Sequence, residues 1–378
     1  MAYEKIAVIG AGIGGLTVAL ALTRPGVRCE VFERSRGLPG IGGGLQLSPN
    51  AVAVLGRLGL GGALAGAVRP VARELRRWQD NEIIARTELG AAAEQRYGSP
   101  YLTLRRSTLS RALVEACRGV QTIHFGRKCT GLRVSDDGVE IELDDGSRSH
   151  ADAVVGADGL HSFVRGQVHR DTVRYSGNAV YRAVLPADRA RWLCSPARVT
   201  VWLGPGRHCV CYPVDGGRSL NLVATVPAAQ PPTSVREVGA SEVLAAYAGW
   251  HPALRGLLAV AGRFEQHGLF DRPALPSWHQ GRLVLLGDAA HPMLPFVAQG
   301  AAQAIEDAEA LAHHLDFARY TAERSPRVAR VAAVAQAGLH DYHLSDGPEQ
   351  EARDGRLRES TVADQDWLYT DQLTGANR

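Results

Sequence analysis

Apolar and polar positions follow two patterns along the chain, and each pattern predicts a different kind of sheet. In the first, short continuous apolar runs are separated by segments with helical spacing, which is typical of buried parallel strands alternating with helices. This pattern predicts strands over residues 6–9, 29–32 and 282–288, and helices over residues 14–22, 299–315 and 320–339. Strands and helices in this order indicate an α/β fold with a mainly parallel sheet.

The second pattern is an alternation of apolar and polar residues over short segments bounded by turn residues, which predicts antiparallel strands. It covers residues 73–79, 82–88, 178–185, 198–203, 207–214 and 218–226, with one helix at about 234–249. Two Asp-Asp-Gly turns, at residues 136–138 and 144–146, indicate a β-meander inserted after the first strand–helix–strand unit. The two patterns together predict an α/β lobe and a second, α+β lobe of mainly antiparallel sheet.

The α/β lobe is built from separated segments, so a single cut does not divide the chain. We predict a first lobe at residues 1–171 and 273–345, a second lobe at 172–272, and a polar, irregular C-terminal tail at 346–378. A glycine-rich loop at residues 37–44 belongs to the first lobe.

Composition excludes several classes of protein. The 378 residues are 45% hydrophobic and 21% charged, with a formal net charge of +3, which is typical of a globular protein large enough for two lobes. No polybasic block indicates nucleic-acid binding, and no run approaches the roughly 18 apolar residues of a membrane span. We therefore expect a cytoplasmic protein without nucleic-acid or membrane partners, and the sequence leaves a homodimer open.

Six cysteines are scattered along the chain, at positions 29, 117, 129, 194, 209 and 211. Cys209 and Cys211 lie two residues apart on one predicted strand, but no second pair completes the four ligands of a zinc site. Buried free thiols in a reducing compartment are the favoured interpretation, and we predict no metal.

The first predicted strand runs directly into a glycine motif. Gly10, Gly12 and Gly15 form G-x-G-x-x-G between a strand and a helix, and Glu33 ends the next strand. In a Rossmann-like lobe these glycines allow a tight turn, the approach of a pyrophosphate to the backbone, and close packing of helix on strand. The helix N-terminus favours phosphates, and the terminal acid can bind a ribose. The motif predicts a dinucleotide site without choosing between NAD and FAD.

Two further motifs make this prediction more specific. The segment GAGIGG at residues 10–15 is followed by GADGLHSFVR at 156–165 and by GDAAHPMLP at 287–295. With these three motifs in order, nearly the whole chain resembles the single-component (group A) FAD-dependent aromatic hydroxylases. The resemblance implies a Rossmann-like FAD-binding lobe, a second lobe over the substrate, and NADH or NADPH as electron donor. It also implies hydroxylation of a small phenolic or aromatic acid by O₂ through a flavin C4a-hydroperoxide.

The resemblance assigns roles to individual residues. Arg106 matches an arginine near the FAD phosphates, and Asp288 would bind a hydroxyl of the ribityl or ribose part. Cys129 would meet the adenine through its backbone, and Gln46 would lie on a loop beside flavin and substrate. The FAD contacts implied in this way are Gly10, Gly12, Gly14, Gly15, Glu33, Arg34, Gln46, Arg106, Cys129, Asp158, Asp288, Gly300, Ala301 and Ala302.

The second lobe holds the candidate catalytic residues. His208 and Tyr212 lie four residues apart on a predicted strand, and therefore on one face. They match a His-xxx-Tyr pair that touches the substrate in the branch containing 3-hydroxybenzoate 6-hydroxylase, salicylate hydroxylase and 6-hydroxynicotinate 3-monooxygenase. The resemblance implies that His208 removes a phenolic proton and that Tyr212 orients the ring or relays the proton. Gln46 stands where the hydroxynicotinate enzymes have a histidine, which favours a phenol as substrate.

Some alternatives stay open on the sequence alone. His208 could be a hydrogen-bonded strand histidine, and Tyr212 could be a core aromatic residue. Arg182 could anchor a substrate carboxylate or be exposed. The chain could also be a tailoring flavoprotein that epoxidises or rearranges a larger substrate, or a protein that holds FAD without hydroxylating.

Overall fold

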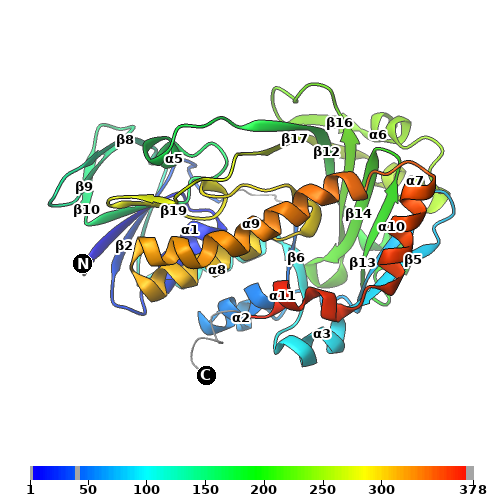
Figure 1. Ribbon diagram of the computed structural model, residues 1–378, viewed down its shortest axis with the longest axis horizontal. Coiled ribbons are helices and arrows are strands. Elements are labelled where there is room, and N and C mark those ends of the chain that lie inside the picture. Colours follow the sequence, from blue (N-terminus) through cyan, green and yellow to red (C-terminus); the bar gives the residue numbers. More distant parts are fainter. Residues whose placement is uncertain (1–2, 39–42, 372–378) are drawn as a thin grey trace.

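The computed structural model describes residues 3–38 and 43–371, so residues 39–42 of the predicted glycine-rich loop lie outside the described part. The chain forms two lobes, each built on its own sheet. Helix α9 (Phe317–Asp341) runs from one lobe to the other (Figure 1). The prediction of an α/β fold with a second, mainly antiparallel lobe is confirmed.

The first lobe contains a six-stranded sheet in the order β18-β19-β11-β1-β2-β7. Its strands are β1 (Lys5–Ile9), β2 (Arg28–Glu33), β7 (Thr122–Phe125), β11 (Ala153–Gly156), β18 (His279–Gln280) and β19 (Leu283–Leu285). All neighbouring strands pair in parallel except β18 and β19. Helices α1 (Ile13–Ala21), α4 (Arg106–Cys117) and α8 (Gly300–His314) share one apolar core with these strands. The central strands β1, β11 and β19 are therefore nearly continuous apolar runs, because the middle of a parallel sheet is covered on both faces.

The predicted β-meander is a separate three-stranded antiparallel sheet between β7 and β11. It consists of β8 (Cys129–Val134), β9 (Val139–Leu143) and β10 (Arg148–Ala151). Gly138 and Gly146, the last residues of the two Asp-Asp-Gly turns, have φ of +153° and +82°. These positive angles explain why glycine ends each turn.

The second lobe is an eight-stranded sheet in the order β16-β17-β12-β15-β14-β13-β4-β5. Its strands are β4 (Ala72–Arg77), β5 (Ile83–Glu88), β12 (Arg174–Pro186), β13 (Arg198–Gly204), β14 (Arg207–Val214), β15 (Ser219–Pro227), β16 (Arg236–Gly239) and β17 (Arg263–Asp271). The predicted hairpin at 73–88 is present, but β4 pairs in parallel with β13. The hairpin therefore belongs to the second lobe, although our predicted boundary placed it in the first. A hairpin forms locally, whereas the sheet it joins depends on long-range pairing.

The two faces of the eight-stranded sheet differ. Helices α6 (Ala240–Ala246) and α7 (Pro252–Ala261) cover one face, where Cys209 and Cys211 are buried, and the other face looks toward the first lobe. The single helix predicted at 234–249 is wrong, because residues 236–239 pair as strand β16 before the shorter α6 begins. Pairing with β17 overrides the local helical preference there.

The segment after α9 is helical, so the predicted irregular tail at 346–378 is wrong over much of its described part. Helices α10 (Pro348–Glu359) and α11 (Asp366–Tyr369) lie against the second lobe and α3 (Gly90–Tyr97) (Figure 1). Helix α10 has little apolar periodicity, and its buried side chains are Arg353 and Asp354. Arg353 donates to the Asp341 carbonyl at the end of α9. The helix is thus fixed by polar tertiary contacts that a hydrophobic pattern does not display.

A short two-stranded sheet ties the lobes together. The sheet consists of β3 (Gly44–Leu47) and β6 (Leu102–Arg105). Helix α2 (Pro49–Arg57) follows β3, and helix α4 follows β6. Gly44 N–H donates to Asn221 Oδ1 of β15 at 2.6 Å, and Thr103 Oγ1 donates to the Pro213 carbonyl at 2.6 Å. Gln46 consequently lies on strand β3, whereas the sequence analysis expected it on a loop.

Two kinds of feature are absent from the described ranges. No helix within residues 3–38 and 43–371 is long and apolar enough to cross a membrane. The same residues contain no group of three or more His, Cys, Asp or Glu side chains placed to hold a metal ion.

Candidate active site

Two adjoining cavities form a trench at the carboxyl ends of the parallel strands. The first, of about 250 Å³, is lined by Glu33, Arg34, Cys129 and Asp158 among others. The second, of about 330 Å³, extends under the eight-stranded sheet. Gly12, Ala157 and Gly159 line both cavities, so the trench is continuous from the end of β2 to the second lobe. The edge beyond the carboxyl ends of parallel strands is where such sheets bind nucleotides.

The glycine motif leaves room for a ligand at one position only. A Cβ on Gly15 would lie 1.9 Å from the Gly10 carbonyl oxygen, so Gly15 permits α1 to pack on β1. Gly10 has φ of +108°, and a Cβ there would lie 2.4 Å from the Ala157 carbonyl oxygen. A Cβ on Gly12 would meet no protein atom within 4 Å and would project beside the trench. These glycines therefore fit a bound pyrophosphate at the N-terminus of α1.

The far end of the trench suits a ribose and a base. Glu33 accepts hydrogen bonds from Ala11 N–H and Ser35 N–H, both at 2.8 Å, which hold its carboxylate at the cavity wall. Arg34 is exposed beside it. The Cys129 thiol points to the Gly131 carbonyl at 3.6 Å, and burial raises its pKa to about 12. The thiol is therefore an unreactive group, and the contact of the Cys129 backbone with an adenine stays a prediction.

The Asp158 carboxylate forms hydrogen bonds within its own turn, unlike a carboxylate that is free to bind a ligand. It accepts hydrogen bonds from Ser162 Oγ at 2.5 Å, Phe163 N–H at 2.7 Å and Val164 N–H at 3.2 Å. These bonds satisfy the first turn of α5 (Phe163–Val168). Although these hydrogen bonds lower its pKa, burial has the larger effect and leaves the pKa raised. The Asp158 side chain thus shapes the cavity wall by ordering the turn behind it.

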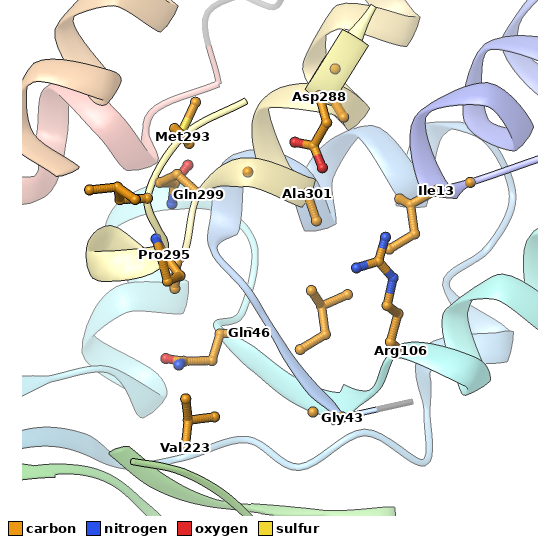
Figure 2. A pocket seen from close by; sticks show the side chains of 18 of the residues that line it. Ile13, Gly43, Gln46, Arg106, Val223, Asp288, Met293, Pro295, Gln299 and Ala301 are labelled. Atoms are coloured by element: carbon orange, nitrogen blue, oxygen red, sulfur yellow. The ribbon is translucent and has the colours of Figure 1, made fainter. Parts of the chain in front are cut away.

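The third motif projects Asp288 into the trench. Figure 2 shows the Asp288 carboxylate and the Arg106 guanidinium pointing into the same space, with Ile13 and Ala301 beside it. Gly300 and Ala301, at the start of α8, line this cavity, whereas Ala302 is fully buried behind them. The free N–H groups and partial positive charge at this helix start favour an anionic ligand. One cavity therefore brings together four of the predicted FAD contacts, Arg106, Asp288, Gly300 and Ala301. A fifth, Ala302, supports them from behind.

A buried ionic network holds the third motif from behind. Asp307 accepts from Gly287 N–H at 3.1 Å and pairs with His291 Nε2 at 2.5 Å and with Arg324 Nε at 2.8 Å. Glu306 pairs with Arg324 Nη1 at 2.6 Å. Burial alone would raise the pKa of Asp307, but His291 and Arg324 together lower it below its ordinary value. The turn containing Asp288 is thus fixed by charges that are buried on α8 and α9.

The substrate side of the cavity is a platform on three neighbouring strands. In the sheet register, His208, Val210 and Tyr212 of β14 lie opposite Thr225, Val223 and Asn221 of β15. Arg182 of β12 lies opposite Val223 on the other side. All seven side chains line the cavity, and Figure 2 shows Val223 and Gln46 across from Met293 and Pro295. The platform has an apolar centre and polar corners, which suits a flat ring with polar substituents.

Tyr212 lies against the strand that connects the lobes. It is 4% exposed, and a Cβ on Gly44 would come within 2.6 Å of its ring. Burial raises the pKa of Tyr212, while the charge of Arg182 and a hydrogen bond with Gln46 act in the opposite direction. Tyr101 Oη in turn donates to Gln46 Oε1 at 2.8 Å. Tyr212 is thus a protonated phenol in a fixed orientation at the cavity wall.

His208 is a buried, neutral histidine. Its Nε2 lies 3.3 Å from Thr225 Oγ1 and its Nδ1 lies 2.8 Å from His343 Nε2. The rings of Phe296 and Tyr342 lie 5.2 and 5.5 Å from its own ring. Burial lowers the pKa of His208 well below its ordinary value, and His343 lowers it further. His208 can therefore accept a proton only if another proton leaves.

Arg182 is a half-buried cation that forms no ion pair or hydrogen bond within the described residues. Its Nε is buried with no hydrogen bond, and no ion pair to Arg182 is present within residues 3–38 and 43–371. Burial lowers its pKa, and Glu265, its register neighbour on β17, raises it without forming an ion pair in the described part of the chain. Arg182 lines the cavity, and its role as a carboxylate anchor stays a prediction.

Sequence reasoning missed several residues around this cavity. Asn221 and Thr225 share an alternating strand with Val223, so their common face was detectable once β15 was paired with β14. His343 and Tyr101 come from distant segments, and no local pattern connects them to His208 or Gln46.

A glycine-lined trench that opens under a second sheet is the arrangement of a two-lobed flavoprotein, whose cofactor here is FAD. Residues 3–333 match the family described as FAD binding domain, and the chain belongs to this family and to its FAD-dependent aromatic monooxygenases. It is 42% identical to a 3-amino-4-hydroxybenzoate 2-monooxygenase of Streptomyces cremeus, over 97% of this chain and 94% of that protein. It is 37% identical to 3-hydroxybenzoate 6-hydroxylase 1 of Aquipseudomonas alcaligenes, with 91% of each covered.

Among solved structures, the chain is similar to Klebsiella pneumoniae HpxO complexed with FAD and uric acid. The TM-score is 0.84 at 27% identity, over 96% of this chain and 94% of that chain. These similarities confirm the family, the fold and the cofactor that the three motifs predicted.

Proposed function

We propose that the protein hydroxylates the ring of a hydroxybenzoate-type acid, with NADH or NADPH as electron donor and O₂ as co-substrate. Bound FAD would supply the oxygen-transfer chemistry, and the protein's residues would bind the acid, orient it and exclude water. The relative from Streptomyces cremeus makes 3-amino-4-hydroxybenzoate the first substrate to test, with hydroxylation at ring position 2.

The unpaired Arg182 is the observation that carries this proposal. Because Arg182 is half-buried and forms no ion pair within the described residues, a ligand carboxylate would supply the missing counter-charge. A guanidinium can hold a carboxylate through two parallel hydrogen bonds, which fixes orientation as well as affinity. With its carboxylate at Arg182 on β12, a single ring would cover Val223 and Val210 and would reach the polar corners on β14.

His208 and Tyr212 would act at the ring hydroxyl. Transfer of an electrophilic oxygen needs an electron-rich ring, and a phenolate is far richer than a phenol. His208, with Thr225, would take the hydroxyl proton, and Tyr212 would hold the ring by a hydrogen bond from its protonated hydroxyl. The charge of Arg182 and the start of α8 would both favour the resulting anion.

Cavity size favours this proposal over a tailoring reaction on a larger substrate. The inner cavity of about 330 Å³ must accommodate the flavin ring as well as the substrate. The space that remains suits one small ring, since ordinary ligand pockets of about 300–1,000 Å³ hold one drug-sized ligand. A homodimer stays a prediction, which sedimentation of the FAD-loaded protein would test.

The experiment pairs a substrate with its carboxylate-free analogue. The FAD-loaded enzyme is given 3-amino-4-hydroxybenzoate, 3-hydroxybenzoate or 2-aminophenol, and NAD(P)H use and oxygenated product are measured. Arg182→Met should raise KM for the acids by about 10–100-fold, the loss of a charge-assisted hydrogen bond, and should leave 2-aminophenol unchanged. Arg174→Met, an exposed change on the same strand, is the control.

Two results would contradict the proposal. An unchanged KM for the acids in Arg182→Met would remove Arg182 as the anchor. Oxygenation of a multi-ring substrate, with none of the acids accepted by the wild type, would favour a tailoring enzyme.

A further inference from the structure

We propose that His343 passes to solvent the proton that His208 takes from the substrate, so that the two histidines form a proton path through the cavity wall. The inference rests on the proposed function, in which His208 receives the hydroxyl proton. It assigns a role to a residue that lies outside the cavity.

The pair connects two separate hollows of the molecule. His208 lines the inner cavity with Thr225, and His343, just after α9, lines a surface groove with Leu339, His340, Asp346 and Glu349. Within the described part of the chain, neither histidine lines both hollows. Their rings are stacked, with centroids 5.1 Å apart and Nδ1 of His208 2.8 Å from Nε2 of His343. One hydrogen bond therefore spans the wall.

The step is a concerted shift of protons along this hydrogen bond. The substrate O–H proton moves to Nε2 of His208, directly or through the Thr225 hydroxyl. The Nδ1 proton of His208 moves to Nε2 of His343, and the Nδ1 proton of His343 leaves to water in the groove. Each ring ends neutral with its proton on the other nitrogen, and the substrate ends as its anion. No group is oxidised or reduced, and the tautomers return by the reverse movement after product leaves.

Burial makes this path preferable to storage of the proton on His208. Burial lowers the pKa of His343 to about 4, and that of His208 is also lowered, so neither ring readily carries a positive charge. Phe296 and Tyr342 close the other sides of His208. A proton that enters at Nε2 is therefore accommodated only when one leaves through Nδ1.

The surroundings of His343 hold it in place and can take up the proton. Gly206 N–H donates to the His343 carbonyl at 2.8 Å, which ties this residue to the start of β14. The titratable groups near the pair include Tyr342, His340, Asp346 and Glu349, with Arg207 next to His208 on β14. On the covered face of the sheet, Tyr247 Oη donates to the His208 carbonyl at 2.7 Å. His340 Nε2 lies 3.5 Å from Glu349 Oε1, and Asp346 accepts from Trp78 Nε1 at 3.1 Å. The groove therefore contains carboxylates that can relay a proton to bulk water.

The test measures proton movement rather than activity alone. FAD-loaded wild type and His343→Gln are mixed with 3-amino-4-hydroxybenzoate or 3-hydroxybenzoate in weak buffer in a stopped-flow instrument. Formation of the bound phenolate is followed by absorbance, and proton release by an indicator dye. Glutamine can keep a hydrogen bond to His208 but does not relay a proton at neutral pH. His340→Gln, in the same groove, is the matched control.

We expect His343→Gln to bind FAD and substrate normally but to release the proton about 10²-fold or more slowly, with product formed per NAD(P)H falling in parallel. In His343→Ala, added imidazole should restore the rate, because it can occupy the vacated space and relay the proton. A normal rate of proton release in His343→Gln overturns the proposal and leaves the pair as a structural link between α9 and β14. Loss of FAD or substrate affinity together with a normal rate of proton release would also overturn the proposal.

His208→Gln separates this inference from the proposed function. If His208→Gln is slow and His343→Gln is normal, His208 is the base and the path through His343 is wrong. If both variants form the phenolate at the wild-type rate, the assignment of His208 as base fails first.

Discussion

The FAD trench and the substrate platform are built from different parts of the polypeptide. The trench is organised around backbone, with the open side of Gly12 and the helix starts of α1 and α8 facing the cavity and charged side chains such as Glu33, Arg106 and Asp288 along its walls. The platform is made of side chains, with Arg182, His208 and Tyr212 held by the pairing of three strands. A cofactor common to a whole family can be bound by backbone geometry, whereas a particular substrate needs particular side chains.

The supports behind the two regions differ as well. Charged side chains of Glu306, Asp307 and Arg324 lie behind the trench, while the neutral pair of His208 and His343 lies behind the platform. Charged pairs fix a turn whose position must not change. Neutral histidines are suited to a place through which a proton moves, because they can exchange tautomers without a net charge.

The largest effect should come from the glycines of the trench. Gly15→Val should prevent accumulation of folded protein, because its Cβ would overlap the Gly10 carbonyl oxygen. Gly12→Val should fold, with a normal circular dichroism spectrum, but should lose FAD, because its side chain would occupy the pyrophosphate space. Flavin content after refolding with excess FAD is the measurement. Retention of FAD by Gly12→Val would mean that the phosphates lie elsewhere.

On the platform, His208→Gln should lower hydroxylation by about 10²–10⁴-fold, the usual contribution of a general base. The flavin spectrum and FAD affinity should stay normal, since His208 lies on the substrate platform and not in the FAD trench. Tyr212→Phe should give a smaller loss with more NAD(P)H consumed per product, because the ring is less well held. The ratio of product to NAD(P)H is the readout, and wild-type ratios in both variants would show the pair to be structural.

Removal of the Arg324 charge, which lies behind the trench, should lower the stability of the folded protein. Arg324→Met should lower the free energy of unfolding by about 3–5 kcal/mol, because it leaves Glu306 and Asp307 buried with fewer partners. Arg319→Met, an exposed change on the same helix, is the control. Denaturant unfolding of the FAD-free proteins measures both, and equal midpoints would show that the network contributes little.

A smaller effect is expected at the trench wall itself. Asp288→Ala should weaken FAD binding by about 1.5–3 kcal/mol, the loss of one charge-assisted hydrogen bond. Folding should be unaffected, because the carboxylate is exposed in the trench. Titration of the FAD-free protein with FAD gives the affinity, and an unchanged value would leave Asp288 without a role in binding the cofactor.

The smallest effect should appear as a difference in acid sensitivity. The pKa of Asp307 is lowered in the folded protein, so its ionised form adds stability above its unfolded pKa of about 3.9. That stability is lost as pH falls from about 4 through the lower, folded value. In Arg324→Met the folded pKa rises, so acid unfolding should begin at higher pH than in the wild type. Unfolding curves between about pH 3 and pH 6 test this, and superimposable pH dependences would contradict it.

The FAD region was predictable largely from sequence because its signals are local. Gly10 and Gly12 lie in the turn between β1 and α1, and Gly15 lies in the first turn of α1, so their spacing already contains the geometry that the structure displays. The four-residue spacing of His208 and Tyr212 likewise placed them on one face of β14, because side chains alternate along a strand. The family, the cofactor and the two-lobed fold followed from these patterns and the resemblance.

Other features depended on contacts between distant segments. The hairpin of β4 and β5 joined the second sheet, and the polar helix α10 formed where no apolar period predicted it. Neither the unpaired state of Arg182 nor the contact of His208 with His343 has a local signature. Local geometry is encoded in short spacings that can be read directly, whereas burial and partners arise only when the whole chain packs. The sequence by itself therefore determined the family, the cofactor and the two-lobed fold, and the tertiary structure decided which side chains line the cavity under the second sheet.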